Sequence, residues 1–198
     1  GTPIMAVPSM HQDLATDPIT DDLVEAAREQ GMHVLWGPLE EGKRKTADHT
    51  EIVARFAHLL NAQRDARRSV AITLGATATP MDDVRRLVNT SSGRTGWALA
   101  DDLYRHGHDV TCIVGLTTVP QPAWLPLIIR AETAPEMLAE CQAVARDRLD
   151  AWVHVAAVLD YLITDPAEGK VASGSDGLQI DLAPGPKHID ALREACEG

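Results

Sequence analysis

The sequence predicts an α/β protein with a mostly parallel β-sheet that is covered by helices on both faces. Short apolar runs of strand length alternate along the chain with longer stretches whose apolar residues recur at the helical spacing. Parallel strands need crossover connections, and helices of this length between the strands supply them. The alternation therefore predicts a three-layer fold.

The first third of the chain predicts two strands, at Pro3–Val7 and Met32–Trp36, with a helix at Asp21–Gln30 between them. A second helix is predicted at Asp48–Ala62, because its apolar residues follow the helical period at Ile52, Val53, Phe56, Leu59 and Leu60. The charged stretch Arg64–Arg68 has the composition of a connector. We therefore expect one unit in residues 1–66 and another in residues 67–198.

The second unit continues the alternation of strands and helices. Its predicted strands are Val70–Leu74, Val110–Gly115, Leu127–Ala131, Trp152–Val158 and Leu178–Ala183, and its predicted helices span residues 94–106, 135–149 and 188–195. Trp152–Val158 is nearly all apolar, which is typical of a strand that is buried on both faces. Leu178–Ala183 alternates with period two, which indicates an edge or antiparallel strand.

Composition and charge argue against several classes of partner. Hydrophobic residues make up 44% of the 198 residues, enough for a continuous core, and the net charge is −11 with a pI near 5.1. A surface this acidic repels nucleic acid and anionic membranes, so we expect neither as a partner. Three cysteines without a paired spacing, no leader and no long apolar run indicate a cytoplasmic protein.

The loop after the predicted strand Val70–Leu74 is a candidate anion site. Ligands of open α/β sheets bind at loops that follow the carboxyl ends of strands. Gly75 lets backbone amides approach an anion, and Thr77 and Thr79 add hydroxyl donors. The same residues also suit an ordinary polar turn, and the loop alone does not separate the two interpretations.

A second candidate loop precedes the helix predicted at residues 94–106. Ser91, Ser92 and Gly93 lie where the free amides and the dipole of a helix N-terminus favour phosphate, and Arg94 adds a positive charge. A plain serine cap is the simpler interpretation. The loop therefore predicts anion binding without predicting a reaction.

Two later loops carry charged side chains. The apolar strand Trp152–Val158 delivers Ala156 and Asp160 to the carboxyl edge of the sheet, where a carboxylate can accept a hydrogen bond from a sugar or base, or cap the next segment. Lys170 follows Gly169 and is a mobile cation suited to neutralising charge during phosphoryl or nucleotidyl transfer. A lone surface lysine carries no weight by itself, so its assignment depends on the other loops.

Four motifs follow one another between residues 69 and 192. They are Gly75-x-Thr77-x-x-Pro80-x-Asp82-x-Val84-Arg85 with Asn89-x-Ser91-Ser92-Gly93-x-x-Gly96, then Ala156-Ala157-Val158-x-Asp160-Tyr161, then Gly169-Lys170-x-x-Ser173-Gly174, and finally Leu178–Leu182 with Pro186-Lys187. In this order they resemble the phosphopantothenate–cysteine ligase (phosphopantothenoylcysteine synthetase) domain of the DNA/pantothenate metabolism flavoproteins. The resemblance implies a three-layer, Rossmann-like fold.

Residues 1–66 resemble a different part of that family. Pro8-Ser9-Met10-His11 and Asp17-Pro18 are similar to the tail of the flavin-dependent decarboxylase that precedes the ligase in many bacteria. His11 stands where that family has a substrate-binding Asn, and Gly37–Asp48 lacks the family's reactive cysteine. The resemblance therefore implies a short flavodoxin-like remnant, with neither FMN nor decarboxylase activity expected from this chain alone.

The ligase resemblance implies a two-step reaction of coenzyme A biosynthesis. The carboxylate of 4'-phosphopantothenate, or of a related acid, attacks CTP to give an acyl-cytidylate, and the amine of cysteine then displaces CMP. Asn89 matches the residue needed for the second step, and Lys170 matches the lysine that supports the first. The matching nucleotide-binding positions are Gly75, Thr77, Ser91, Ser92, Gly93, Ala156 and Asp160. Mg²⁺ is implied with the triphosphate, and a homo-oligomer is implied as the assembly.

Departures from the family pattern keep a second hypothesis open. Ala76, Leu162 and Ala172 stand where the family has glycine or basic residues, and the family's basic C-terminal stretch does not appear before Gly198. Each missing charge-assisted bond costs about 1.5–3 kcal/mol. The alternative is a catalytically silent binding or regulatory subunit. A dehydrogenase is weaker, because there is no G-x-G-x-x-G, and the scattered histidines predict no protein metal site.

Overall fold

The chain forms two compact units in the computed structural model, which describes residues 2–147, 149–172, 174 and 177–196. The first unit comprises Gly1–Arg67 together with Tyr104–His108, and the second comprises Arg68–Leu103 and Asp109–Gly198. Among the described residues, no helix combines the length and the apolar character needed to cross a membrane. Each unit has its own secondary structure and is described by itself.

The first unit is built on one parallel pair of strands. β1 (Ile4–Ala6) pairs in parallel with β3 (Met32–Val34), and the helix α2 (Pro18–Glu29) connects them. α3 (His49–Asn61) follows. These elements confirm the predicted strand–helix–strand–helix order, although α2 begins three residues early because the side chain of Asp17 caps it, accepting from the amide of Ile19 at 2.9 Å.

A small antiparallel sheet in the first unit was not predicted. It consists of the two-residue strands β2 (Met10–His11), β5 (Lys43–Arg44) and β4 (Leu39–Glu40), in that order, and the short helix α1 (Gln12–Ala15) follows β2. Strands of two residues are too short to show a periodic pattern, so sequence alternation does not reveal them.

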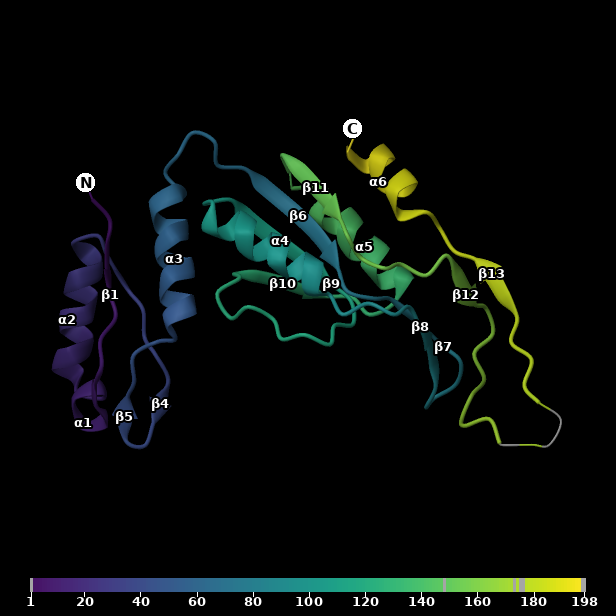
Figure 1. Cartoon of the computed structure of the whole chain (residues 1–198), viewed down its shortest axis with the longest axis horizontal. Helices are drawn as coiled ribbons and strands as arrows, with labels where there is room; N and C mark the ends of the chain where they lie inside the picture. The colour runs from purple at the N-terminus through teal and green to yellow at the C-terminus, as the bar shows by residue number, and fades with distance from the viewer. Residues whose placement is uncertain (1, 148, 173, 175–176, 197–198) are drawn as a thin grey trace. The chain divides into compact units, whose positions relative to one another are not determined.

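The second unit contains a four-stranded parallel sheet in the order β10-β9-β6-β11. Its strands are β6 (Ser69–Leu74), β9 (Asp109–Val114), β10 (Leu127–Arg130) and β11 (Ala151–His154), and its helices are α4 (Arg94–Arg105), α5 (Ala134–Val144) and α6 (His188–Cys196). Figure 1 shows α4 and α5 running along this sheet. The predicted Rossmann-like α/β fold with a mostly parallel sheet is confirmed.

Successive residues of β6 point to opposite faces of the sheet and bury both. Ala71 packs with Ile113 of β9 and with Met137 and Cys141 of α5. Leu74 points to the other face, where the backbone of Gly96 in α4 lies directly against its side chain. The sheet is therefore enclosed between α4 on one face and α5 on the other.

Three boundaries in the second unit differ from the prediction. β11 ends at His154 and forms the edge of the sheet, with its side chains half-buried or exposed, so the expected strand buried on both faces is wrong. α5 ends at Val144, where the amides of Arg146 and Asp147 bond carbonyls three residues back and close the last turn. The last strand, β13, is Leu182–Pro184 and not Leu178–Ala183.

Two antiparallel pairs extend from the carboxyl side of the sheet. β7 (Ala78–Pro80) and β8 (Arg86–Val88) form a hairpin, and β12 (Tyr161–Ile163) pairs with β13. β13 confirms the expected antiparallel character of the last strand. The other three strands were not predicted, because each has only three residues.

Acidification is expected to destabilise the second unit through His188. This histidine begins α6 and is buried, and burial followed by the nearby His154 lowers its pKa. Below about pH 6.5 the unfolded chain binds a proton on His188 that the folded chain excludes. The contribution of His188 to the free energy of unfolding is therefore complete above about pH 6.5, and it decreases as the pH falls toward the pKa of the folded state. Urea unfolding of wild type between pH 7 and 5 should show this loss, at most about 1.4 kcal/mol per pH unit.

His188→Gln should flatten that dependence, because glutamine does not titrate. His49→Gln is the matched control, since the His49 side chain is 92% exposed in α3. Equal pH dependences for wild type and His188→Gln would contradict the assignment.

Candidate functional site

The candidate site lies at the carboxyl edge of the parallel sheet. β6, β9 and β11 run in the same direction, so the loops that leave them begin at one edge. These loops are joined by backbone hydrogen bonds: the amide of Ala157 donates to the carbonyl of Gly75 at 2.8 Å, and Ala76 and Leu116 exchange two bonds of 2.9 and 2.8 Å. The hydrogen-bonded backbone of Gly75, Ala76, Leu116 and Ala157 therefore forms the base of the site, here called its backbone floor.

Gly75 makes the first turn of this floor possible. Its φ is +83°, a backbone conformation that residues with a side chain rarely adopt. An added Cβ would also lie 2.7 Å from the carbonyl oxygen of Leu116. Gly75 therefore allows two loops to approach backbone to backbone. Contact between Gly75 and a nucleotide stays a prediction.

Thr77 is fully buried, so its hydroxyl serves the fold. Its amide donates to the carbonyl of Ala157 at 3.1 Å, and its hydroxyl oxygen accepts from the amide of Leu159 at 2.8 Å. Thr79 accepts in the same way from Ile163, at 3.2 Å. Both hydroxyls thus hold the chain that continues from β11. The sequence predicts a different role for them, as donors to an anion. That predicted contact of Thr77 remains untested.

Asn89 is held against this floor from two sides. Its side-chain nitrogen donates to the carbonyl of Ala157 at 3.1 Å, and its backbone amide lies 3.4 Å from the carbonyl of Thr77. The Ala157 carbonyl therefore accepts from both Thr77 and Asn89. Since the amide nitrogen is engaged, the side-chain oxygen of Asn89 is the group available to accept a further hydrogen bond.

The loop Ser91–Gly93 forms the N-terminus of α4. The hydroxyl of Ser91 accepts from the amide of Gly93 at 3.4 Å, and that of Ser92 accepts from Arg94 at 3.3 Å. Both bonds are long, so an anion with charged oxygens could replace the hydroxyls at these amides. The serine hydroxyls thus engage the same backbone amides that would hold a phosphate.

Gly93 has a φ of +75°, and a methyl group of Thr117 occupies the space beside it. A Cβ on Gly93 would lie 2.5 Å from that methyl carbon, and the same methyl also lies beside Gly75. Thr117 therefore packs between the two glycine loops. Sequence reasoning missed both Thr117 and the bridging role of Ala157; the apolar run ending at Gly115 was the available signal for Thr117.

Ala156 and Asp160 lie on the chain that continues from β11. Ala156 is half-buried and packs against the hydrophobic core. Asp160 is exposed, and its carboxylate forms an ion pair of 2.5 Å with Lys187, which raises the pKa of Lys187. Lys187 thus places a cation beside a predicted nucleotide contact, a position that sequence analysis did not assign.

Lys170 lies apart from the other predicted catalytic residue. Its neighbours bond to the turn between β7 and β8: the carbonyl of Gly169 accepts from Asp83 at 3.3 Å, and the amide of Val171 donates to Asp82 at 3.1 Å. Asn89 follows β8, so it comes at the end of that strand opposite to the turn. Ser173 of the same motif lies outside the described residues.

Together these features define an α/β protein of Rossmann-like fold, with glycine- and serine-containing loops at the carboxyl edge of its sheet. Residues 66–197 match the model of the DNA/pantothenate metabolism flavoprotein C-terminal domain. The chain belongs to this family, which confirms the resemblance drawn from the four motifs.

Named relatives agree with this assignment. The coenzyme A biosynthesis bifunctional protein CoaBC of Thermococcus kodakarensis is 34% identical over 198 residues, covering all of this chain and 48% of that protein. CoaBC of Mycobacterium tuberculosis is 30% identical, covering 96% and 46%. The crystal structure of a CoaBC C-terminal domain has a TM-score of 0.56 at 26% identity, covering 68% and 61%. The chain spans about half the length of the curated relatives it matches.

Proposed function

We propose that the second unit catalyses CTP-dependent amide formation between 4'-phosphopantothenate, or a related small carboxylate, and the amine of cysteine. Family membership supports a ligase role in coenzyme A biosynthesis. The observation that carries the proposal is Asn89, which is fixed on the Ala157 carbonyl at 3.1 Å beside the loop Ser91–Gly93. This arrangement puts an acceptor oxygen next to a helix N-terminus suited to phosphate.

The proposed chemistry has two displacements. A carboxylate oxygen of the acid attacks the α-phosphorus of CTP, and the bond to pyrophosphate breaks. The amine nitrogen of cysteine then attacks the activated carbonyl carbon, CMP leaves with the electron pair of the C–O bond, and the amine loses a proton. Amides of Gly93 and Arg94 would stabilise charge on the nucleotide phosphate, and Asn89 would orient the acyl-cytidylate for the amine.

Mg²⁺ enters the proposal with the nucleotide. Mg²⁺ keeps several waters and binds substrate phosphates with few protein ligands. The described part of the chain contains no group of three histidine, cysteine or carboxylate side chains that could hold a metal ion. We propose that Mg²⁺ arrives with the nucleotide phosphates, and that Gly75, Ala156 and Asp160 contact the nucleotide.

The assembly and the location of the chain follow the same proposal. Small-molecule acids and amines are its expected ligands, a homo-oligomer is its expected assembly, and the cytoplasm is its expected compartment. The acidic net charge of −11 favours neither nucleic acid nor an anionic membrane as a partner.

Pyrophosphate release tests the ligase proposal directly. The full chain with CTP, Mg²⁺ and 4'-phosphopantothenate should release pyrophosphate without cysteine, and CMP only when cysteine is added. Lys170→Ala should slow pyrophosphate release about a hundredfold, because a cation that offsets phosphate charge is lost. Lys43→Ala is the control, since Lys43 is an exposed lysine of β5 in the other unit.

A silent binding subunit is the second candidate, and the serine hydroxyls that already engage the amides of Gly93 and Arg94 favour it. The absence of pyrophosphate with CTP or ATP across several acids would reject the ligase proposal. A stable complex with a catalytically complete relative, without turnover, would then support the binding role.

A further inference from the structure

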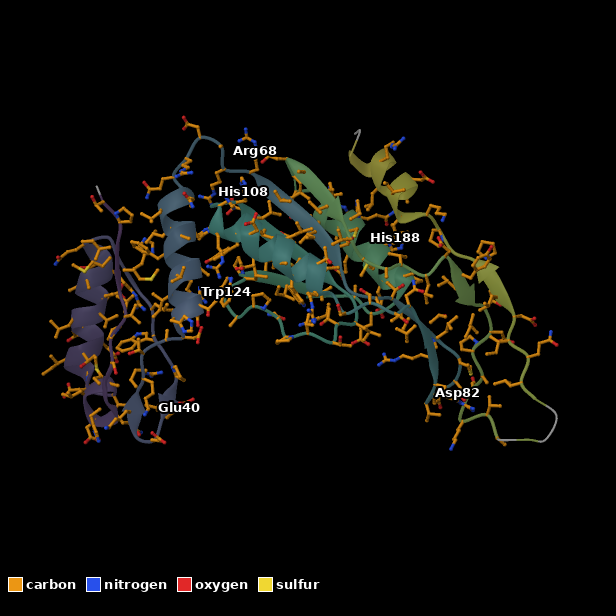
Figure 2. The ribbon with its side chains drawn as sticks, viewed as in Figure 1. Glu40, Arg68, Asp82, His108, Trp124 and His188 are labelled. Carbon is orange, nitrogen blue, oxygen red and sulfur yellow. The ribbon has the colours of Figure 1, made fainter. Side chains whose placement is uncertain are left out.

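A buried carboxylate joins the β7–β8 turn to the loop that carries Lys170. Asp82 lies in this turn (Figure 2), and its side chain is fully buried. Its Oδ1 accepts from the backbone amides of Val84 and Arg85, at 3.0 and 2.7 Å. Its Oδ2 accepts from the guanidinium of Arg85, at 2.9 and 2.6 Å, and from the amide of Val171 at 3.1 Å. The two oxygens therefore have different tasks: Oδ1 closes the turn, and Oδ2 reaches across to another segment.

Arg85 completes the connection from the other side. Its Nη2 donates both to Asp82 and to the carbonyl of Val171, each at 2.6 Å. The amide and the carbonyl of Val171 are thus both held by one ion pair, in which the carboxylate is buried and the guanidinium is partly exposed. The hairpin does not need these two bonds for its own closure, so they serve the attached loop.

The residue on the other side of Lys170 is held as well. The Asp83 carboxylate accepts from the amide of Gly169 at 3.1 Å, and the Asp83 amide lies 3.3 Å from the Gly169 carbonyl. Lys170 itself is exposed. Its backbone is therefore fixed at both neighbours while its side chain extends into solvent.

The ion pair is the strongest part of this connection. The Arg85 guanidinium holds the pKa of Asp82 well below its usual range, and hydrogen bonds from the amides of Val84, Val171 and Arg85 act in the same direction. Charge-assisted, forked contacts of this kind are stronger than neutral hydrogen bonds and set geometry as well as affinity. These contacts therefore favour the charged form of the Asp82 carboxylate.

We propose that Asp82 is a positioning residue, which acts through Arg85 and Val171 to hold Lys170 in the orientation its reaction requires. This role rests on the proposed ligase function, in which Lys170 supports the first step. Fixing a flexible cation before the charged transition state forms spares the cost of ordering it during the reaction. Asp82 contacts neither nucleotide nor acid in this proposal.

Asp82→Asn separates the two tasks of the side chain. Asparagine keeps Oδ1, so it can still accept from the amides of Val84 and Arg85 and close the turn. Its nitrogen replaces Oδ2 and cannot accept from Arg85 or Val171. The variant should therefore fold with an intact hairpin while the loop around Lys170 is released.

Limited trypsin digestion detects whether the loop around Lys170 is released, and it requires no ligase assay. Trypsin cuts after lysine, and the Lys170–Val171 bond is protected as long as Val171 is held. Cleavage of this bond, followed by intact mass, should become about tenfold faster in Asp82→Asn. Asp165→Asn is the matched control, because it removes an exposed carboxylate five residues before Lys170 and should leave the rate unchanged.

Kinetics then show whether the released loop matters for the reaction. In Asp82→Asn, kcat for pyrophosphate release should fall about tenfold with the KM for CTP within about twofold of wild type, because positioning is lost and ground-state binding is kept. The double variant Asp82→Asn/Lys170→Ala should be no slower than Lys170→Ala alone. Arg85→Lys, which keeps the charge and loses the fork, should reproduce the faster cleavage.

Distinct results overturn distinct claims. Unchanged cleavage of Lys170–Val171 in both Asp82→Asn and Arg85→Lys overturns the positioning role, and so do losses that multiply in the double variant. A wild-type chain that releases no pyrophosphate overturns the ligase proposal instead, and with it the reaction that Lys170 would be positioned for.

Discussion

Gly96→Ala is expected to lower the free energy of unfolding of the second unit by about 3 kcal/mol, at the upper end of the range for overpacked cores. A Cβ at position 96 would lie far closer to the Cβ of Leu74 than van der Waals contact allows, and Leu74 is itself fully buried in β6. Neither atom can rotate away, since a Cβ is fixed by its backbone. Relief requires α4 to move off the sheet, and this movement would also displace Ser91–Gly93 at its N-terminus.

Urea denaturation measures this loss, and Thr95→Ala is the matched control. Thr95 precedes Gly96 in α4 and is exposed, so the side chain of an alanine at position 95 would meet solvent and not the sheet. Alanine is also the better helix former, so this control should be neutral or slightly stabilising. If the two variants unfold at the same urea concentration, the close approach of α4 to β6 is not a stability determinant.

The two inner strands of the central sheet, β6 and β9, could be predicted because both of their faces are largely buried. The apolar runs at Val70–Leu74 and Val110–Gly115 are long enough to identify β6 and β9, and one stretch of helix length, α4, lies between them. The hairpin β7–β8 could not be predicted from the sequence. Each of its strands has only three residues, and these include Pro80 and the exposed Arg86, Leu87 and Val88. Its turn is closed by the Asp82 side chain, which accepts from the amides of Val84 and Arg85, and no apolar periodicity marks that contact.

The candidate site was predicted as loops but not as a set of contacts. Gly75, Ser91 and Gly93 are informative because their residue types match the backbone demands of anion-binding turns. Ala157 was overlooked because its function lies in a carbonyl oxygen, which every residue has. Only the fold shows that this oxygen accepts from both Thr77 and Asn89.

Asn89→Asp is expected to block the second chemical step while the first continues. The aspartate cannot donate to the Ala157 carbonyl, which Asn89 reaches at 3.1 Å, and its charge would face that oxygen instead. The side chain should turn away and no longer orient the acyl-cytidylate for the amine. Amide formation should fall by about a hundredfold or more, with one equivalent of acyl-cytidylate accumulating per site.

Quenched-flow analysis with mass detection of the acyl-cytidylate measures this accumulation. Asn61→Asp is the matched control, because Asn61 also donates its side-chain amide to a backbone carbonyl, that of Arg105 at 2.7 Å, in the first unit. The control loses the same type of bond, so it should lose stability and keep both chemical steps. If Asn61→Asp accumulates the intermediate equally, or Asn89→Asp turns over normally, Asn89 has no special part in the transfer to the amine. The hydrogen bond to Ala157 would then belong to the fold alone, because the comparison separates a positioned amide from one that only holds two segments together.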